Sequence, residues 1–234
     1  MRFLLYDVES TSLINDYKAK SSDWEKFPRI VQIAFAIYDD QMDRKIDIGT
    51  RNIHGYIIKP EGWDIPQDAT DIHGITTERA MDEGVDARFA MGAFWALQGE
   101  VDFFVAHNSS FDSKLIRADS ARIGGPNRIT KIPTICTMHS TTKWCNLPGK
   151  RGPKWPKLTE LFEKCFNEPM ANAHDAVGDV LGMMDCFKYL RQNDVISQAT
   201  LEAAVDRHLK IEKAVKDKAA REAGQESSVS AEEF

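Results

Sequence analysis

The sequence has no apolar run long enough to cross a membrane. A membrane-spanning helix needs about 20 consecutive apolar residues, and polar or charged residues interrupt every such stretch of this chain. The first residues also lack a basic segment followed by a long apolar one, so we expect no signal peptide. These absences favour a cytoplasmic protein with no membrane partner.

Cysteine is scarce as well. The chain has four cysteines, irregularly spaced, and no Cys-x-x-Cys pair. The closest approach to a zinc-binding pair is Cys136 with His139 three positions later, which alone is a weak indication of a zinc site. We therefore interpret the four cysteines as free, buried thiols of a protein in a reducing compartment.

A net positive charge, which is typical of nucleic-acid-binding domains, is missing too. The formal net charge is −6. Basic residues are nevertheless concentrated between Ser113 and Lys157, where ten Lys and Arg accompany a single acid, Asp119. Two interpretations stay open: a surface that binds a polyanion, and a solvated face that happens to be basic.

The 234 residues, 42% of them hydrophobic, suffice for one domain with a sizeable core. We place this domain at residues 1–193. Beyond it the composition changes, and Leu201, Val205 and Leu209 recur every four residues among Lys, Glu and Ala. We therefore predict a charged helical extension over residues 194–234, with a frayed tail from Gly224.

Two acids end the first predicted strand. The apolar run from Phe3 to Tyr6 leads directly into Asp7, and Glu9 follows two positions later. Because side chains alternate along a strand, both carboxylates point to one face and repel each other. A cation with a preference for oxygen ligands, such as Mg²⁺ or Mn²⁺, relieves that repulsion. An acidic strand end at the surface is the simpler interpretation of these two residues alone.

The remaining chain predicts a mixed α/β arrangement. A second and a third strand, joined by a short link, form an antiparallel meander with the first. A later strand runs into a polar turn and a helix, the unit whose carboxyl end often carries ligands. Strands are predicted at residues 30–38, 52–58, 101–106 and 129–137, helices at 86–98, 112–123, 158–166 and 173–192 (with Asn172 as the cap), and irregular segments at 10–27 and 139–155.

Further acids stand at the starts of two of these helices. Asp112 opens the helix after the fourth strand, and His174 and Asp179 open the helix at 173–192. If the first strand is central and the fourth is its neighbour, Asp112 lies beside Asp7, and a helix crossing the sheet end can deliver Asp179. Two divalent metals satisfy four such carboxylates and are the usual machinery of phosphoryl displacement. His174 titrates near neutrality and can accept a proton from water.

The ordered motifs resemble those of the DEDDh group of 3′–5′ exonucleases, the DnaQ-like family of proofreading epsilon subunits within the ribonuclease-H-like superfamily. The first motif is matched by residues 6–11 (YDVEST) and the second by 106–112 (AHNSSFD). The third is matched by His174 with Asp179 five positions later, since a tyrosine-type motif would place Tyr where Asp175 stands. Residues 72–76 (IHGIT) match as well. The resemblance covers residues 1 to about 191.

The resemblance implies a ribonuclease-H-like mixed five-stranded sheet, with a central first strand and an antiparallel second strand, flanked by helices. It implies hydrolysis of phosphodiester bonds at the 3′ end of DNA, with release of nucleoside 5′-monophosphates. Asp7, Glu9 and Asp179 would hold one Mg²⁺ or Mn²⁺, Asp7 and Asp112 would hold a second, and His174 would be the general base. The implied substrate-binding residues are Ser10, Thr11, Ser12, Leu13, His73, Asn108 and Phe111.

Two segments depart from the compact family pattern. The loop at residues 10–27 is longer, and the segment at 137–157 is unusually basic. We hypothesise that both embrace the strand being degraded, with Trp24 or Trp155 stacking on bases; these aromatics are equally well explained as core or loop anchors. The predicted nucleic-acid patch consists of Lys143, Lys150, Arg151, Lys154 and Lys157. We interpret His54, His139 and His208 as structural or solvated, and His107 as a support of the site.

Other functions stay open. An RNA substrate, as in oligoribonuclease-like relatives, is the nearest alternative, because no residue shows whether the pocket accepts a 2′-hydroxyl. A polymerase or repair accessory that acts mainly by binding is another, with residues 197–223 docking as an amphipathic helix. The intact set of acids argues against a purely binding role. A glycosidase is excluded, because Asp7 and Glu9 share one strand face and cannot flank a sugar ring.

Overall fold

The structure is a computed structural model of the chain, and it describes residues 1–40, 53–126 and 131–229, with the helix backbone alone over most positions beyond Asp217. The strands are β1 Arg2–Ser10, β2 Ile30–Asp39, β3 Ile53–Ile57, β4 Phe103–Ala106 and β5 Thr134–Cys136. The helices are α1 Gln67–His73, α2 Thr77–Glu83, α3 Ala87–Ala96, α4 Ser109–Arg122, α5 Thr137–Cys145, α6 Leu158–Phe166, α7 Ala176–Gln192 and α8 Gln198–Val229. Two short 3₁₀ turns, η1 Trp24–Lys26 and η3 Gln98–Glu100, complete the set.

The five strands form one mixed sheet in the order β3-β2-β1-β4-β5. β1 lies at the centre, antiparallel to β2 and parallel to β4, and β5 continues the parallel half. This arrangement confirms the predicted α/β fold with a central first strand and an antiparallel second one. It also places β4 beside β1, as the predicted meeting of Asp7 and Asp112 requires.

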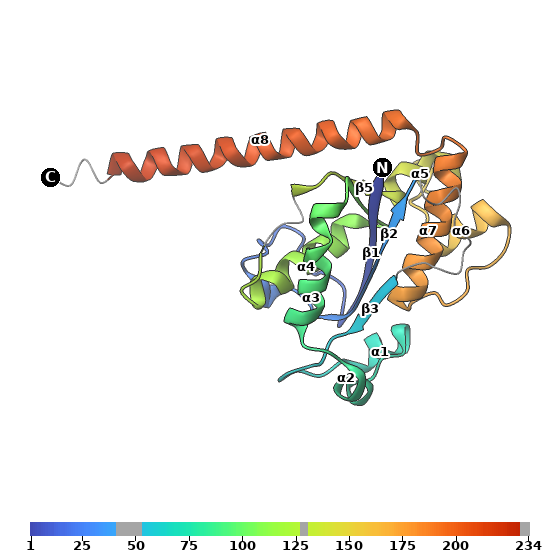
Figure 1. Cartoon of the computed structure of the whole chain (residues 1–234), viewed down its shortest axis with the longest axis horizontal. Helices are drawn as coiled ribbons and strands as arrows, with labels where there is room; N and C mark the ends of the chain where they lie inside the picture. Colours follow the sequence, from blue (N-terminus) through green and yellow to red (C-terminus); the bar gives the residue numbers. More distant parts are fainter. Residues whose placement is uncertain (41–52, 127–130, 230–234) are drawn as a thin grey trace.

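Alternating side chains of β1 divide the core into two layers. Phe3 and Leu5 face the helix α7, while Leu4 and Tyr6 face α3 and α4. Figure 1 shows α6 and α7 on one side of the sheet and α3 and α4 on the other. Because Asp7 continues the face of Phe3 and Leu5, its carboxylate points toward α7.

One predicted irregular segment is a helix. Residues 139–155 were expected to be irregular, but α5 occupies Thr137–Cys145. Its buried residues Met138, Thr141 and Cys145 recur at helical spacing, and the Thr141 hydroxyl donates to the Thr137 carbonyl. Threonine favours strands over helices, so the Thr-rich composition concealed this helix. Residues 146–155 are non-helical, as predicted.

Several element boundaries differ from the prediction; α4, for example, begins at Ser109 and not at Asp112. β5 is limited to Thr134–Cys136, and residues 129 and 130 of the predicted strand lie outside the described part of the chain. α7 begins at Ala176, because the Asp175 side chain accepts from the Gly178 amide and caps the helix. Asn172 is therefore not the cap. Its φ of 55° and that of His174, 68°, are left-handed, so these two residues cannot belong to the right-handed helix itself.

Helix α8 covers the outer strand of the parallel half. Leu201 and Ala204 are buried in the core beside β5, and covering an edge strand in this way prevents it from pairing with other chains. The helix then runs past the rest of the protein as a long rod (Figure 1). Its backbone is helical to Val229, beyond the Gly224 position where we predicted fraying. None of the described helices is long and apolar enough to cross a membrane.

All four cysteines are buried and free, as predicted. Among the described residues the one cluster of His, Cys, Asp or Glu side chains that could hold a metal ion consists of carboxylates, so Cys136 and His139 form no zinc site.

Candidate functional site

The end of β1 presents two carboxylates toward α7. Asp7 pairs with Ala34 of β2 and Glu9 with Gln32, and both acids are half-buried. Directly after Glu9 the register shifts, so that Ser10 pairs with Ile30. A bulge of this kind bends a strand and redirects its side chains, and it is common beside functional sites.

The start of α7 is attached to β2 by one buried side chain. The Gln32 amide donates to the Asp175 carboxylate over 2.9 Å, and its carbonyl oxygen accepts from the Ala176 amide over 3.0 Å. The preceding loop packs so closely that a Cβ at Gly178 would collide with the Asn172 carbonyl. These contacts hold the first turn of α7, and with it Asp179, opposite the end of β1.

Asp7, Glu9 and Asp179 together form the group that can hold a cation. One carboxylate oxygen from each lies within 4.8 Å of the others. Three carboxylates at this spacing are a ligand set for a divalent cation that prefers oxygen, as Mg²⁺ and Mn²⁺ do. The structure therefore brings three of the four predicted metal ligands together.

Asp112, the fourth predicted ligand, is 2% exposed and lies beside this group rather than within it. The pairing of β1 with β4 stops at Leu5, short of Val8, and the Val8 amide donates to one Asp112 oxygen over 3.3 Å. The other Asp112 oxygen is buried with no hydrogen bond. A buried carboxylate oxygen without a partner is costly unless a ligand satisfies it.

Burial and mutual repulsion disfavour the ionised form of the four carboxylates. Burial, followed by repulsion from Asp112, raises the pKa of Asp7 well above its ordinary value. Burial likewise raises the pKa of Glu9 to about 7, that of Asp112 to about 8 and that of Asp179 to about 6, with neighbouring carboxylates adding to each. Deprotonating all four costs free energy that bound cations offset, so the residues present fit a divalent-metal centre.

His174 stands at the exposed edge of this centre. Its backbone amide donates to an Asp179 oxygen over 3.3 Å, and its side chain is exposed. The left-handed backbone, with φ 68°, costs a non-glycine residue about 1 kcal/mol. Such a conformation persists only where the surroundings enforce it, and here it orients Asp179.

The predicted substrate residues fall into two groups. The first group follows Glu9 at the end of β1. The Ser10 hydroxyl donates to the Ser12 carbonyl, and the Thr11 hydroxyl accepts from the Arg29 amide. The Leu13 side chain is 77% exposed. Asn108 and Phe111 are half-buried at the start of α4, adjacent in sequence to Asp112.

His73 is placed differently. It is buried at the end of α1, where its Nδ1 accepts from the Ile75 amide. No contact recorded among the described residues joins it to the four acids. Burial lowers the pKa of His73, and its Nε2 is buried without a partner.

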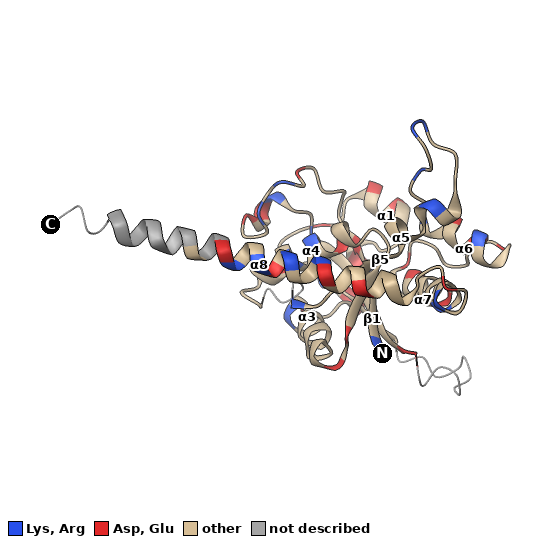
Figure 2. Ribbon diagram, turned by 90° about the horizontal axis from the view of Figure 1, so that it is seen from above, with Lys and Arg blue, Asp and Glu red and all other residues tan. Residues whose placement is uncertain are grey.

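The basic segment divides into structural and exposed cations. Arg122 pairs with Asp119 and donates to the carbonyls of Trp24 and Phe27, so it anchors the 10–27 loop onto α4. Lys154 pairs with Glu160 over 2.5 Å. Lys143, Lys150, Arg151 and Lys157 are exposed. Figure 2 shows basic residues at the tip of the loop that projects between α5 and α6.

The two tryptophans proposed to stack on bases differ in exposure. Trp24 is half-buried under the Arg122 guanidinium, 5.3 Å from its ring centre, and is a loop anchor. Trp155 is 64% exposed, with the His139 ring 5.1 Å away.

The remaining histidines have structural contacts. His54 stacks on Phe35 and His208 pairs with Glu212 over 3.8 Å. Both ring nitrogens of His107 are hydrogen-bonded, to the Thr137 hydroxyl and the Pro156 carbonyl, and burial lowers its pKa to about 4. His107 thus joins the end of β4 to the basic loop.

Sequence reasoning missed Gln32 and Asp175. The signal for Gln32 was its polarity within an otherwise apolar strand, and for Asp175 its position four residues before Asp179.

Comparisons with known proteins agree with this fold. The family model RNase_T, described as an exonuclease, matches residues 4–187. Among solved structures the chain superposes on E. coli exonuclease I with a TM-score of 0.64 at 20% identity, over 88% of this chain and 43% of that one. The zinc-bound form of its complex with single-stranded DNA gives a TM-score of 0.62 at 19% identity, over 86% and 42%.

A complex of the same enzyme with a dA16 oligonucleotide gives a TM-score of 0.61 at 19% identity, over 83% of this chain and 42% of that one. At these identities the likeness shows the fold, and the chain spans less than half the length of the proteins it resembles. No curated protein sequence matches it.

Proposed function

Because the chain belongs to the RNase_T exonuclease family, whose model spans most of its length, we propose that it is a metal-dependent 3′–5′ exonuclease of the cytoplasm. In this proposal it hydrolyses phosphodiester bonds at single-stranded or frayed 3′ ends of DNA and releases nucleoside 5′-monophosphates. The observation that carries the proposal is the carboxylate group of Asp7, Glu9 and Asp179 with Asp112 beside it.

We assign the cation sites as follows. Asp7, Glu9 and Asp179 would hold one divalent cation, and Asp7 with the unpartnered oxygen of Asp112 would hold a second. Mg²⁺ or Mn²⁺ fits both sets of oxygen ligands. When bound, the cations would neutralise the carboxylates, lower the pKa of an attacking water and stabilise the leaving oxygen.

His174 is the general base of the proposed reaction. The water proton moves to its imidazole, a bond forms between the water oxygen and phosphorus, and the bond from phosphorus to the 3′ oxygen breaks. The departing 3′ oxygen takes a proton from solvent, and the exposed His174 side chain gives its own proton back to solvent. The amide of the same residue restrains Asp179, so base and ligand are positioned by one backbone segment.

Residues around the centre would bind the terminal nucleotide. Ser10, Thr11, Ser12 and Leu13 form the chain immediately after Glu9, and Asn108 and Phe111 lie immediately before Asp112. The exposed apolar side chain of Leu13 suits contact with a base or sugar. His73 stays a candidate for the same pocket, although its recorded contacts are local.

DNA is the proposed substrate because the exonuclease I structures that share this fold are complexes with DNA oligonucleotides. An oligoribonuclease-like activity on RNA is the alternative. The test uses 5′-labelled DNA and RNA single strands of one sequence, resolved as shortening ladders. A DNA ladder that shortens one nucleotide at a time supports the proposal. Release of the label in the first product would show the opposite polarity, and faster shortening of RNA would favour the alternative.

A polymerase or another replication or repair protein is the proposed protein partner. Leu209, Ile211 and Val215 of α8 are large apolar residues that are exposed, which suits docking of an amphipathic helix. Replacing Leu209 and Val215 by Ser should abolish co-purification of a polymerase with the protein and leave ladder formation intact. Unchanged co-purification would reject α8 as the docking element.

A further inference from the structure

A groove of about 220 Å³ runs between α4 and α8 along the edge strand β5. Its polar lining comes from Ser109, Ser113 and Arg117 of α4, Thr134 of β5, and Arg207 and His208 of α8. Figures 1 and 2 both show α8 crossing over β5 and α4. The groove therefore exists because the C-terminal helix packs on the exonuclease domain.

Arg117 differs from Arg122 and Arg191, two other arginines with a buried guanidinium nitrogen, because no acid that the structure describes pairs with it. Three arginines among the described residues have a guanidinium nitrogen buried without a hydrogen bond: Arg117, Arg122 and Arg191. The charge of Arg122 is balanced by Asp119 and that of Arg191 by Asp40. Arg117 is half-buried and has no recorded partner in the described part of the chain. Partial burial of a cation without a counter-charge is unfavourable unless an anion binds.

The other polar residues of the lining can also contact an anion, beside the apolar Ile132, Ala204 and Ile211. Arg207 is exposed and has no recorded ion pair with the described residues, and His208 faces Glu212 at 3.8 Å. The hydroxyls of Ser109, Ser113 and Thr134 add hydrogen-bond donors. Two guanidinium groups with hydroxyl donors are the chemistry that binds a phosphate group.

The groove and the acid centre share helix α4. Residues 109, 113 and 117 recur every four positions and lie along one side of α4, and Asp112 is on the same helix. At a rise of about 1.5 Å per residue, Arg117 stands about 7–8 Å further along the helix axis than Asp112. A strand whose 3′ end reached Asp112 would thus bring a nearby phosphate within range of the groove.

We infer that the α4–α8 groove binds a backbone phosphate of the nucleic-acid strand, on the 5′ side of the nucleotide being removed. This inference rests on the proposed exonuclease function and gives α8 a part in substrate binding. In this proposal the groove contacts a phosphate and no base, so it raises the affinity for longer strands without sequence preference.

The test compares three substrates: the p-nitrophenyl ester of thymidine 5′-monophosphate, a dinucleotide and a long oligothymidylate. Arg117→Gln and Arg207→Gln, singly and together, should leave kcat/KM for the ester and the dinucleotide near that of the unmodified protein. For the long strand kcat/KM should fall about tenfold in the double variant. Loss of one phosphate contact should also reduce the slope of log kcat/KM against log salt by about 0.7.

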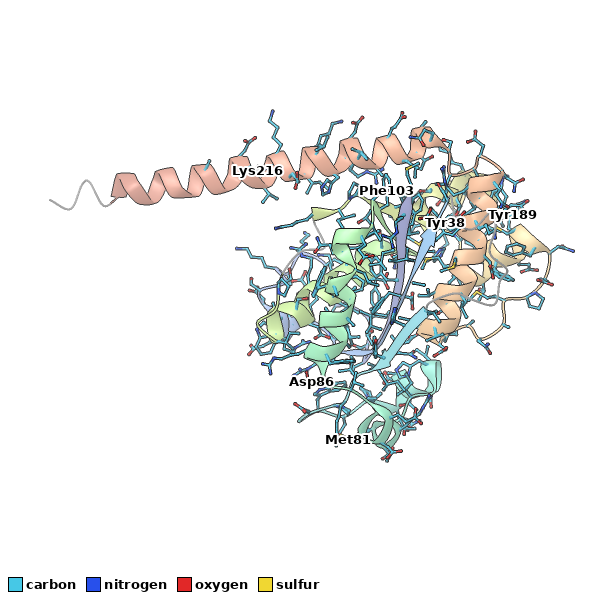
Figure 3. All side chains as sticks on the ribbon, in the orientation of Figure 1. Tyr38, Met81, Asp86, Phe103, Tyr189 and Lys216 are labelled. Carbon is cyan, nitrogen blue, oxygen red and sulfur yellow. The ribbon has the colours of Figure 1, made fainter. Side chains whose placement is uncertain are left out.

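Two further variants serve as controls. Arg117→Lys keeps the charge and should retain most of the long-strand activity. Lys216→Gln removes an exposed cation of α8 outside the groove (Figure 3) and should change none of the three rates. Because Arg207 is exposed, its variant carries the test even if Arg117→Gln unfolds.

The outcomes separate the two claims. If the unmodified protein hydrolyses neither the ester nor the strands, the proposed exonuclease function is wrong. If it hydrolyses all three and the double variant keeps the long-strand rate and salt slope, the groove does not bind substrate. An equal loss on the dinucleotide and the long strand would place these arginines at the terminal nucleotide and would also overturn the inference.

Discussion

The acid centre and the α4–α8 groove have one property in common: each collects charges of one sign that the described part of the chain does not balance. In the centre these are Asp7, Glu9, Asp112 and Asp179, and in the groove they are Arg117 and Arg207. Two other buried arginines of the described chain are paired, Arg122 with Asp119 and Arg191 with Asp40. Paired charges hold the fold together, whereas unbalanced ones indicate where ligands bind.

The two regions differ in the structural elements that support them. The acid centre rests on the central strand, and its position relative to α7 is fixed by the buried Gln32 side chain. The groove lies at the sheet edge and is closed by one helix with exposed side chains. We therefore expect all-or-none effects from changes in the centre and graded effects from changes in the groove.

The largest effect is expected from Asp7→Asn. Loss of this shared ligand should reduce kcat on DNA by about a thousandfold or more, in the range found when one key electrostatic group is removed from an active site. Without added metal the variant should unfold at the same or a higher temperature, because a repelling carboxylate has gone. Asp82→Asn, an exposed acid of α2, is the matched control and should change neither quantity. An active Asp7→Asn protein would contradict the assignment of the centre.

His174→Ala should reduce kcat by roughly a hundredfold to a thousandfold, the usual contribution of a general base. Its backbone bond to Asp179 is retained, so Mg²⁺ should still raise the melting temperature. At a metal concentration 100 times the Kd that stabilisation is about 2.7 kcal/mol, or about 5–10 °C for a domain of this size. Calorimetry with and without Mg²⁺ measures it. A variant that loses both turnover and the thermal shift would make His174 a structural residue.

The smallest effect is expected from the basic loop. Lys150 and Arg151 are exposed near its tip, so replacing both by Gln should lower long-strand affinity only a few-fold and flatten its salt dependence. Lys154→Gln should do less to binding, because Glu160 already balances this charge. Titration of a labelled strand at several salt concentrations gives the slopes. Equal slopes for the Lys150/Arg151 variant and the unmodified protein would reject the loop as a binding surface.

The sequence predicted the sheet and named all four acids of the centre because local signals agreed there. An apolar run ending in Asp7 and Glu9 specifies a buried strand, and the order of later motifs then fixes its neighbours. The family model and the strand order confirm the family and the sheet, and the roles of the acids stay a prediction.

What the sequence did not predict depends on tertiary contacts. The α5 helix was hidden by its threonines, whose hydroxyls bond back to the preceding turn. The role of Gln32 depends on α7, more than 140 residues away. The basic segment looked uniform, yet Arg122 is buried against Asp119 while Arg117 faces a groove completed by Arg207. Which cation is paired is decided by packing, and no local pattern encodes it.

The most direct test of the central claim is hydrolysis of the thymidine 5′-monophosphate ester after chelation. This small substrate reports on the acid centre alone, since it does not extend into the groove or the loop. The account predicts no turnover in EDTA, recovery when Mg²⁺ or Mn²⁺ is added in excess, and no recovery in Asp7→Asn. Turnover that persists after complete removal of divalent cations would contradict the assignment of the four carboxylates to a metal-dependent nuclease centre.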